Sequence, residues 1–390
     1  MDSVLIENKV LKLDKSNWKL TKVGELAKDI SKRVDNPSES GYDRFVGLNH
    51  FVSGDIKIKN WGPTKTLTSS TKAFEAGDIL FARRNAYLRR ASLVDFDGCC
   101  SGDAFVLREN HEKVVPGFLA FFMNSNALWD YANSNAAGTM SKRVKWRDLA
   151  EYEILLPPKD QQAQLAKLLW AIDEVIEKEK EVSEKIEKTY ITLVDNLFSK
   201  RNEEWDFVRL GKISSINAKS LNSKTDPEYE FKYLDLASII EPKVIGELKR
   251  IKYGEAPSRA KRIVNDNSIV LAMVRPYQKA FAFVENGKDV IGSTGTAVIN
   301  MHDSSLNRFV FHQFFSKRFT RYCEDRMTGT SYPAITPKDV DEYKVSVPND
   351  SDLIRSESEK LDDLEISSSS VRNKIEHSQS LQKSLINQVF

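Results

Sequence analysis

The sequence is poor in the features that define several common protein classes. Its 390 residues include only three cysteines, two of them adjacent, so neither a disulfide framework nor a zinc site with paired cysteines can be built. No stretch approaches the roughly 18 consecutive apolar residues of a membrane-spanning helix, and the N-terminus is acidic where a signal peptide is cationic. We therefore expect a soluble, cytoplasmic protein in which Cys99, Cys100 and Cys323 are buried thiols.

Sequence motifs of the common enzyme classes are missing as well. The chain has no GxxxxGK[ST] loop, no GxGxxG after a strand, no HExxH, no EF-hand loop and no GxSxG elbow. It also lacks an NPPY-type tetrapeptide and a glycine-rich cofactor loop, which counts against a methyltransferase. We therefore predict no catalytic residue and no metal site. One enzymatic alternative stays open, a nuclease built from scattered carboxylates such as Asp78, Asp95 and Asp97.

The overall composition is that of a globular protein with room for two domains, 41% hydrophobic and 29% charged. Its 58 basic residues nearly balance its 56 acidic ones, for a net charge of +2. Divided by segment, residues 1–158 and 201–348 are mildly basic, whereas 159–200 and 349–390 are acidic. Such small net charges do not identify a partner, because clustering of charges makes a nucleic-acid-binding surface and their sum does not.

The chain contains an internal repeat. Five anchors recur in the same order at spacings between 187 and 193 residues. They are residues 18–24 with 205–211, 101–106 with 294–299, 138–139 with 329–330, 152–157 with 343–348, and 193–198 with 385–390. Anchors in one order at nearly constant spacing predict a tandem duplication. None of the five histidines is repeated, so the two copies share a fold rather than acid–base chemistry.

The first part of each copy is mixed. It opens with a short helical pattern that runs from Val23 to Ile30 in the first copy and from Leu210 to Ile216 in the second. Apolar runs typical of strands follow, at residues 77–81, 104–107, 268–274 and 297–299. Next come helical stretches with aromatic residues at helical spacing, at 116–131 and 306–322. We expect these aromatic side chains to lie in the core.

The second part of each copy predicts a long helix. Between Gln161 and Phe198 there is neither Gly nor Pro, and apolar residues recur every three or four positions, as in a coiled-coil seam. The predicted seam consists of Leu165, Leu168, Ile172, Val175, Val182, Ile186 and Leu193. At about 1.5 Å per residue the helix would be roughly 57 Å long, so we expect two such helices to pack on each other. In the second copy four serines at 367–370 interrupt the pattern, and we expect that helix to be bent or frayed there.

Together these patterns predict an α+β protein of mixed α/β units with a pseudo-twofold internal repeat. Two globular domains are separated by two long helices that pack as an antiparallel coiled coil. We place the first domain at residues 1–158, the central helix at 159–200, the second domain at 201–348 and the C-terminal helix at 349–390.

Two polar segments in each copy are candidates for a DNA interface. One directly follows a strand and is rich in arginine in the first copy, and the other follows the repeated Gly-Thr pair. Guanidinium groups form paired hydrogen bonds with phosphates and guanine, and Asn does so with adenine. The candidate DNA-binding residues are Arg83, Arg84, Asn85, Tyr87, Arg89, Arg90, Lys142, Arg143 and Lys145, and, in the second copy, Arg275, Tyr277, Gln278, Lys279, Ser331, Tyr332 and Lys338. Solvated loops without a ligand remain the alternative interpretation.

Several of these segments resemble the specificity subunit of type I restriction-modification systems. They are residues 77–90 (GDILFARRNAYLRR), 100–107 (CSGDAFVL), 138–139 (GT) and 156–162 (LPPKDQQ), the last leading into the first long helix. The resemblance extends from Trp18 to Phe390, and the order of parts is recognition domain, helical spacer, recognition domain, helical spacer. The second copy departs from the family pattern at 347–352, which lacks the double proline and the glutamine pair.

The resemblance implies DNA recognition without catalysis. In the family, each recognition domain reads one half of a bipartite, asymmetric double-stranded DNA site, and the helices fix the gap between the halves. The helices also dock methyltransferase subunits, usually two, which bind S-adenosylmethionine, and restriction subunits that use ATP and Mg²⁺ join outside. We therefore expect no cofactor in this chain and no membrane partner. Two alternatives stay open: a bipartite DNA-binding scaffold of another defence or regulatory assembly, and an enzyme with unrecognised catalytic groups.

Overall fold

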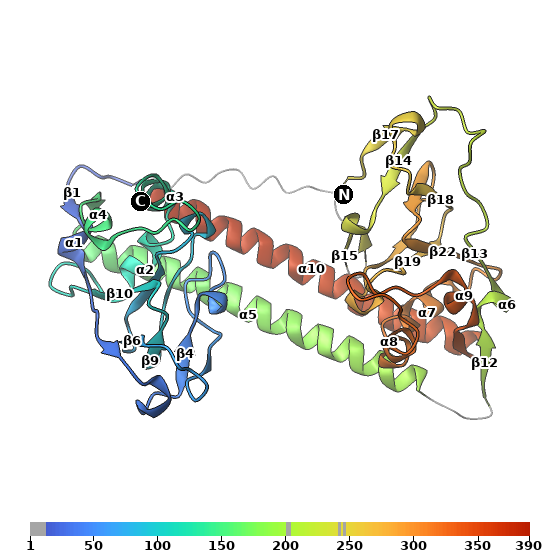
Figure 1. Ribbon diagram of the computed structural model, residues 1–390, viewed down its shortest axis with the longest axis horizontal. Helices are drawn as coiled ribbons and strands as arrows, with labels where there is room; N and C mark the ends of the chain where they lie inside the picture. The colour runs from blue at the N-terminus through green and yellow to red at the C-terminus, as the bar shows by residue number, and fades with distance from the viewer. Residues whose placement is uncertain (1–12, 200–203, 241–242, 245–246) are drawn as a thin grey trace. The chain divides into compact units, whose positions relative to one another are not determined.

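The computed structural model describes residues 13–199, 204–240, 243–244 and 247–390. The chain forms two compact units (Figure 1). Unit 1 comprises Met1–Lys180 and Asn373–Phe390, and unit 2 comprises Glu181–Arg372. Both units mix strands and helices, as predicted. Within the described residues, no helix combines the length and the apolar character needed to cross a membrane.

Unit 1 contains three sheets. Their strand orders are β2-β10-β7-β8, β3-β6-β9-β4-β5 and β1-β11. The strands are β1 (Lys19–Lys22), β2 (Ala27–Asp29), β3 (Arg33–Val34), β4 (Arg44–Val46), β5 (Gly62–Pro63), β6 (Thr71–Phe74), β7 (Ile79–Ala82), β8 (Ala91–Leu93), β9 (Gly98–Cys100), β10 (Ala104–Glu109) and β11 (Glu153–Leu156). The helices are α1 (Val23–Leu26), α2 (Phe118–Phe122), α3 (Asn126–Ser134) and α4 (Trp146–Ala150), with the 3₁₀ turns η1 (Pro37–Glu39), η2 (Leu48–His50) and η3 (Ala86–Leu88).

Unit 2 repeats this plan. Its sheets have the orders β13-β22-β19-β20, β17-β14-β21-β18, β12-β23 and β15-β16. The strands are β12 (Trp205–Arg209), β13 (Ser214–Ile216), β14 (Glu230–Leu234), β15 (Ile239–Ile240), β16 (Lys243–Val244), β17 (Arg250–Lys252), β18 (Ala260–Val264), β19 (Ser268–Ala272), β20 (Phe281–Val284), β21 (Val290–Ser293), β22 (Thr296–Met301) and β23 (Lys344–Pro348). The helices are α6 (Leu210–Ile213), α7 (Leu306–Gln313), α8 (Lys317–Glu324) and α9 (Pro337–Glu342), with the 3₁₀ turns η4 (Leu236–Ser238), η5 (Tyr253–Glu255) and η6 (Pro276–Gln278).

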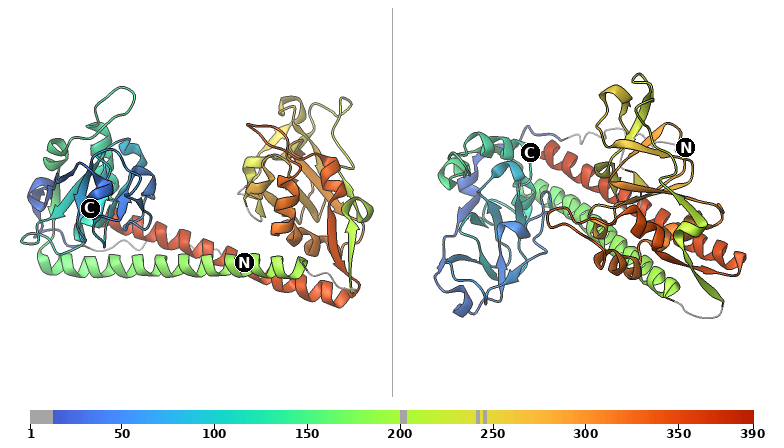
Figure 2. Two further views of the ribbon diagram at one scale, coloured as in Figure 1. Left: turned by 60° about the horizontal axis from the view of Figure 1, so that its bottom comes forward. Right: turned by 45° about the vertical axis from the view of Figure 1, so that its right-hand side comes forward.

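The core of unit 1 lies between its four-stranded sheet, the helices α2 and α3, and the beginning of a long helix, α5 (Lys159–Phe198) (Figure 2). Phe81 of β7 stacks on Trp129 of α3 with ring centroids 4.4 Å apart. Phe121 of α2 meets Trp170 of α5 at 4.6 Å. The aromatic side chains of the predicted helical stretch are therefore core residues, as expected, and they bind the sheet to the long helix.

Two predictions about short helices need correction. The opening helix is only four residues long in each unit, and the chain continues directly as β2 or β13, because the backbone there pairs with β10 or β22. The stretches at 116–131 and 306–322 each form two helices. Ser125 and Ser316 begin a new helix by accepting a hydrogen bond from the backbone N–H three residues later.

Strand pairing also corrects one anchor of the repeat. Phe105 faces Phe81 in unit 1, and Ala297 faces Leu271 in unit 2. The strands are therefore equivalent at a spacing of 192 residues, one less than the sequence comparison gave. The sequence comparison matched Gly102 with Gly295. In the structure, the N–H of Arg83 donates to the carbonyl of Asp103, and the N–H of Met273 makes the equivalent hydrogen bond to the carbonyl of Gly295. Asp103 is therefore the counterpart of Gly295.

Two long helices, α5 and α10 (Ser351–Val389), pack antiparallel within each unit. In unit 1, Leu165 packs with Val389, and Gln382 donates to Asp173 at 3.2 Å. In unit 2, Val194 lies in one cluster with Leu361. Residue numbers rise along α5 as they fall along α10, which confirms the predicted antiparallel arrangement. The helix α10 continues through residues 367–370, so the predicted fraying at the serines is absent.

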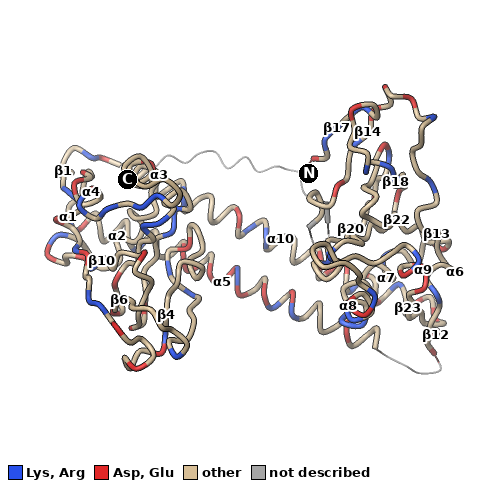
Figure 3. The backbone as a smooth tube through the Cα atoms, viewed as in Figure 1, with Lys and Arg blue, Asp and Glu red and all other residues tan. Residues whose placement is uncertain are grey.

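The buried seam of α5 has a different phase from the predicted one. Gln162, Ala166, Leu169, Asp173 and Ile176 are buried. Of the predicted seam, Leu165 is buried as predicted, whereas Leu168, Val175, Val182 and Leu193 are 40–50% exposed. The reason is that α5 contacts the globular part of each unit as well as α10. Polar side chains that have specific partners in the globular part therefore take part in the buried seam. The charged residues of both long helices include both signs (Figure 3).

Candidate nucleic-acid interface

The arginine-rich segment forms the turn between two neighbouring strands, which we call the hairpin turn (residues 83–90 in unit 1 and 273–280 in unit 2). It consists of a 3₁₀ turn flanked by two residues in the left-handed conformation. These are Asn85 and Arg89 in unit 1, with φ of 54° and 47°, and Arg275 and Lys279 in unit 2, with φ of 49° and 53°. For residues other than Gly this conformation costs about 1 kcal/mol or more each, so its repetition marks a backbone path that both units maintain.

The segment after each Gly-Thr pair also keeps one shape, and we call it the Gly-Thr loop (residues 138–143 and 329–334). Gly138 and Gly329 have φ of 125° and 97°, which favours glycine. The loop is closed by two backbone hydrogen bonds between Ala137 and Arg143, 3.0 and 2.9 Å long. In unit 2, Thr328 and Ala334 form the same pair, with both hydrogen bonds at 3.0 Å.

The structure brings the two predicted segments together in each unit. In unit 1 the N–H of Asn85 donates to the carbonyl of Lys142 at 3.0 Å, and Nε of Arg84 donates to Oγ of Ser141 at 2.5 Å. In unit 2 the N–H of Arg275 donates to the carbonyl of Pro333 at 2.8 Å, and its Nη2 donates to the carbonyl of Ser331 at 3.0 Å. Hairpin turn and Gly-Thr loop thus form one continuous surface.

The cations of the unit 1 surface fall into two groups. Arg143 donates two hydrogen bonds to Asp103, at 2.8 and 3.1 Å, and Arg89 donates to Asn126 and Asp130 at 2.6 and 2.9 Å. The hydrogen bond from Arg143 holds the pKa of Asp103 below its usual value. These two arginines therefore act mainly as internal supports of the surface.

Of the other candidate cations of the unit 1 surface, Arg84 lies 3.6 Å from Asp103, and Arg83, Arg90, Lys142 and Lys145 have no carboxylate partner within the described residues. Arg83 lies over the ring of Phe105 at 5.5 Å. Arg90 donates to the carbonyls of Leu48 and Arg84, and burial lowers its pKa. Two lysines of the prediction, Lys142 and Lys145, are exposed. This leaves positive charge that is available to an anionic ligand.

In unit 2 the surface has fewer cations and more aromatic rings. The guanidinium of Arg275 lies 4.8 Å from the ring centre of Tyr332, and Tyr277 is exposed at the apex of the hairpin turn, as Tyr87 is in unit 1. Of the remaining predicted residues, Ser331 and Gln278 are exposed. Lys279 donates to the carbonyl of Phe315, and Lys338 lies on α9, 3.8 Å from Glu342.

Two residues of the surface were missed by the sequence prediction. Asp103 lies among the arginines of unit 1, and Met140 is exposed at the tip of the Gly-Thr loop. Asp103 was missed because its partner Arg143 is 40 residues away in the sequence and the second copy has Gly295 at the equivalent position. Met140 was passed over because methionine carries neither charge nor a strong hydrogen-bonding group.

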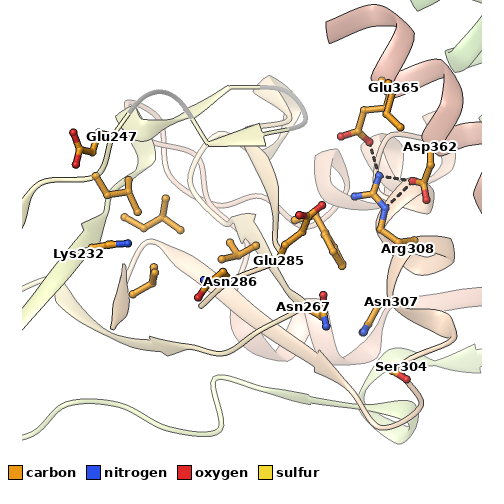
Figure 4. A pocket seen from close by; sticks show the side chains of 16 residues that line it. Lys232, Glu247, Asn267, Glu285, Asn286, Ser304, Asn307, Arg308, Asp362 and Glu365 are labelled. Atoms are coloured by element: carbon orange, nitrogen blue, oxygen red, sulfur yellow. Dashed lines mark hydrogen bonds and ion pairs between the residues drawn. The ribbon is translucent and has the colours of Figure 1, made fainter. Parts of the chain in front are cut away.

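Two of the three carboxylates named for the nuclease alternative have structural partners, and the third, Asp95, is exposed. Asp78 is buried and accepts two hydrogen bonds from Arg108, and Asp97 accepts one from the backbone N–H of Ala76. Among the described residues, one group has metal-ligand geometry, His312 with Asp362 and Glu365 in unit 2. Figure 4 shows the guanidinium of Arg308 bonded to both carboxylates, beside a cavity of about 980 Å³. The arginine thus supplies the positive charge that a metal ion would bring.

Comparison with known proteins agrees with this architecture. The chain matches the sequence model of the type I restriction modification DNA specificity domain twice, over residues 15–188 and 202–376. It is 25% identical over 177 residues to the type I restriction enzyme EcoDI specificity subunit of Escherichia coli, covering 44% of this chain and 39% of that protein. It is 26% identical over 183 residues to the putative type I restriction enzyme MjaX specificity subunit of Methanocaldococcus jannaschii, covering 46% and 42%. The matched region thus spans about two fifths of the length of these curated relatives.

A solved structure has the same fold. The crystal structure of the type I restriction-modification S subunit from M. genitalium superposes with a TM-score of 0.62, over 97% of this chain and 98% of that one, at 17% identity. Because the two matches of the sequence model together cover most of its length, the chain belongs to the family of type I restriction modification DNA specificity domains.

Proposed function

We propose that this chain is the DNA-specificity subunit of a type I restriction-modification complex. Each unit reads one half of a bipartite, asymmetric double-stranded DNA site through its hairpin turn and Gly-Thr loop. The chain has no catalytic residues of its own. S-adenosylmethionine, ATP and Mg²⁺ belong to the methyltransferase and restriction subunits with which it assembles, in the cytoplasm.

One observation carries the proposal: the two units hold the same two segments together by equivalent backbone hydrogen bonds while presenting different side chains. Asn85 and Arg275 occupy the same left-handed position and donate to equivalent carbonyls, of Lys142 and Pro333. A common backbone with different polar side chains suits a protein that reads two different base sequences, since base-edge contacts specify sequence and phosphate contacts set register.

The helices are the proposed docking site for methyltransferase subunits. In unit 1, Leu168 and Val175 lie seven residues apart on α5. Their side chains are 40% and 50% exposed. In unit 2, Val182 and Leu193 of the same helix are similarly exposed. Apolar side chains at helical spacing on a charged helix suit burial against a partner protein.

Co-purification combined with sequencing of modified bases tests the proposal. The tagged chain is purified from its host, the mass of the complex is determined, and host DNA is sequenced for modified bases with and without the gene. We expect methyltransferase subunits in the complex and loss of adenine methylation at one split, asymmetric motif when the gene is deleted. A control strain carries Leu20→Ala, a change of an exposed residue on β1 outside the proposed surface.

Other outcomes separate the alternatives. A chain that binds a split DNA site from a random duplex library but purifies without a methyltransferase, in cells with an unchanged methylome, would favour a scaffold of another assembly. Hydrolysis or modification of DNA by the purified chain alone would show that it is an enzyme and contradict the proposal.

A further inference from the structure

The most exposed large apolar side chain of each unit lies on its Gly-Thr loop. Within the described residues, Met140 is 99% exposed in unit 1, and Tyr332 is 71% exposed in unit 2. Single exposed apolar residues are common on protein surfaces and need no explanation. Here the large apolar side chain with the highest exposed fraction lies on the same loop in both copies of a duplicated fold, although the residues differ. The paired hydrogen bonds at the base of the loop align Met140 with Ser331 and Ser141 with Tyr332, so the two copies expose an apolar side chain at adjacent positions of the same loop.

The loop is held at its base and beside its tip. In unit 1 the paired hydrogen bonds between Ala137 and Arg143 close its base, and Arg143 is fixed by Asp103. Ser141, the neighbour of Met140, accepts from Arg84. In unit 2 the guanidinium of Arg275 lies against one face of the Tyr332 ring. A pre-positioned tip loses little conformational entropy when it binds, which favours insertion into a partner.

The surroundings of the tip select the partner. Lys142 is exposed two residues from Met140, and Arg84 donates to Ser141, the neighbour of Met140. In unit 2 the cation beside the tip is Arg275, whose guanidinium lies 4.8 Å from the ring centre of Tyr332. An apolar side chain surrounded by cations fits DNA, because the cations contact phosphates while the apolar group enters the base stack. Methionine is among the side chains that proteins insert between base steps, and tyrosine can stack on bases.

We propose that Met140 in unit 1 and Tyr332 in unit 2 are wedge residues that enter the base stack of their half-sites and unstack one base step each. The inference rests on the proposed function and deepens it. Part of the specificity would then come from the ease with which a given base step unstacks, in addition to contacts with base edges.

Fluorescence of 2-aminopurine tests the wedge. The full chain, together with the subunits that co-purify with it, binds duplexes carrying the split site obtained above, with 2-aminopurine placed in turn at each adenine of both half-sites. A bound methyltransferase subunit flips its own target adenine out of the stack, so apart from that position we expect emission to rise at one further step of each half-site when wild-type protein binds. Met140→Ala should abolish this further rise in the first half-site only, and Tyr332→Ala in the second only. Binding should weaken roughly three- to tenfold, because only the stacking contribution is lost.

Further variants separate stacking from a general loss of structure. Met140→Leu keeps an apolar side chain of similar size and should retain the rise, whereas Met140→Gln has similar length but is polar and should lose it. Leu20→Ala removes an exposed apolar side chain elsewhere in unit 1 and should change nothing. Bound wild-type protein with no further rise in emission, or an undiminished further rise in Met140→Ala, would overturn the wedge and leave the proposed function intact. Failure of wild-type protein to bind any duplex would overturn both.

Discussion

At the residue scale, the arginines of the unit 1 surface differ in what faces them. Arg89 donates hydrogen bonds to Asn126 and Asp130, so its charge is already paired with a side chain of the protein. Arg84 is tied only through Nε to Ser141 and lies at a longer distance from Asp103. Residues that look alike in the sequence therefore have different surroundings: Arg89 is paired within the fold, and Arg84 is the one that we propose contacts DNA.

This difference predicts opposite effects of two alanine substitutions. Arg84→Ala should weaken DNA binding and reduce the slope of log affinity against log salt by about 0.9, the value for one phosphate contact. Arg89→Ala should leave that slope unchanged and lower the stability of the protein by about 1 kcal/mol, since a partly exposed charge-assisted pair is lost. Fluorescence anisotropy at several salt concentrations, with thermal unfolding of both variants, measures the two effects. Equal salt slopes for wild type and Arg84→Ala would contradict the assignment.

A buried histidine gives unit 2 a predicted dependence on pH. His312 is fully buried, with Nε2 2.8 Å from Asp362 and Nδ1 2.8 Å from the hydroxyl of Tyr190. Burial lowers its pKa below the ordinary value of 6.5, and the neighbouring Arg308 adds to this effect although Asp362 opposes it. Below pH 6.5 the unfolded chain therefore takes up the proton more readily than the folded one, and stability should fall as the pH is lowered from 6.5.

His312→Phe is the matched variant, because Phe121 holds the equivalent place in unit 1, four residues before the serine that begins the next helix. Calorimetric unfolding between pH 7.5 and 5 should show a smaller loss of Tm with falling pH in the variant than in wild type. The other ionisable groups of the site, Arg308, Asp362, Glu365 and Tyr190, are present in both proteins, so the difference between them reports the histidine together with its hydrogen bond to Asp362. An identical pH dependence would show that His312 does not titrate in this range.

The sequence could predict which segments form the candidate surface, but only part of what each residue does there. Arg83, Arg84, Tyr87, Arg275 and Tyr332 all belong to the surface formed by the hairpin turn and the Gly-Thr loop. That Arg143 and Lys279 point to internal partners depends on Asp103 and on the carbonyl of Phe315, which are distant in sequence and near only in the fold. The residue type shows that a side chain is charged. Whether that charge is paired within the protein depends on the tertiary structure.

At the element scale, helix length was predictable and helix phase was not. The absence of Gly and Pro correctly indicated that α5 continues to Phe198. The apolar series suggested a seam through Leu168 and Val175, but Gln162 and Asp173 are buried instead. Gln162 bonds to backbone groups of Lys113, Val115 and Pro157, partners that no periodicity can reveal. The exposed apolar residues of the series fit the proposal that this face of the helix binds a partner protein.

Two neighbouring residues of α5 test that interpretation. Ile176 is buried, so Ile176→Ala should lower the free energy of unfolding by about 2–5 kcal/mol. Val175 is half-exposed, so Val175→Glu should change stability by no more than about 0.5 kcal/mol and should weaken the proposed methyltransferase docking. Denaturant unfolding and quantitative co-purification provide the measurements. Normal co-purification of Val175→Glu would remove this face of α5 from the docking site.

At the scale of the whole molecule, duplication is the feature that the sequence revealed best. The anchors identified two copies, and both the family matches and the repeated sheet order agree with them. Between the anchors the copies have diverged, and there the sequence was least informative. The sheet β3-β6-β9-β4-β5 of unit 1 has five strands, while its counterpart in unit 2, β17-β14-β21-β18, has four. The sequences of the two copies have therefore diverged most in the parts of each unit that the shared fold does not constrain.

The continuity of α5 across both units leads to a prediction about the DNA site itself. We insert one heptad after Val182 in α5 and a matching heptad after Arg372 in α10. Seven helical residues add about 10.5 Å and nearly preserve the rotational phase of the helix. At about 3.4 Å per base pair, the gap between the two half-sites should lengthen by about three base pairs, while each half-site keeps its sequence, because the hairpin turns and Gly-Thr loops are unaltered. Sequencing of modified bases in cells that carry only the extended chain measures the gap directly.

Matched four-residue insertions serve as a control, since they turn the helix by an additional fraction of a turn and should abolish modification at every gap length. Methylation at the original gap by the heptad variant would mean that the helices do not set the distance between half-sites.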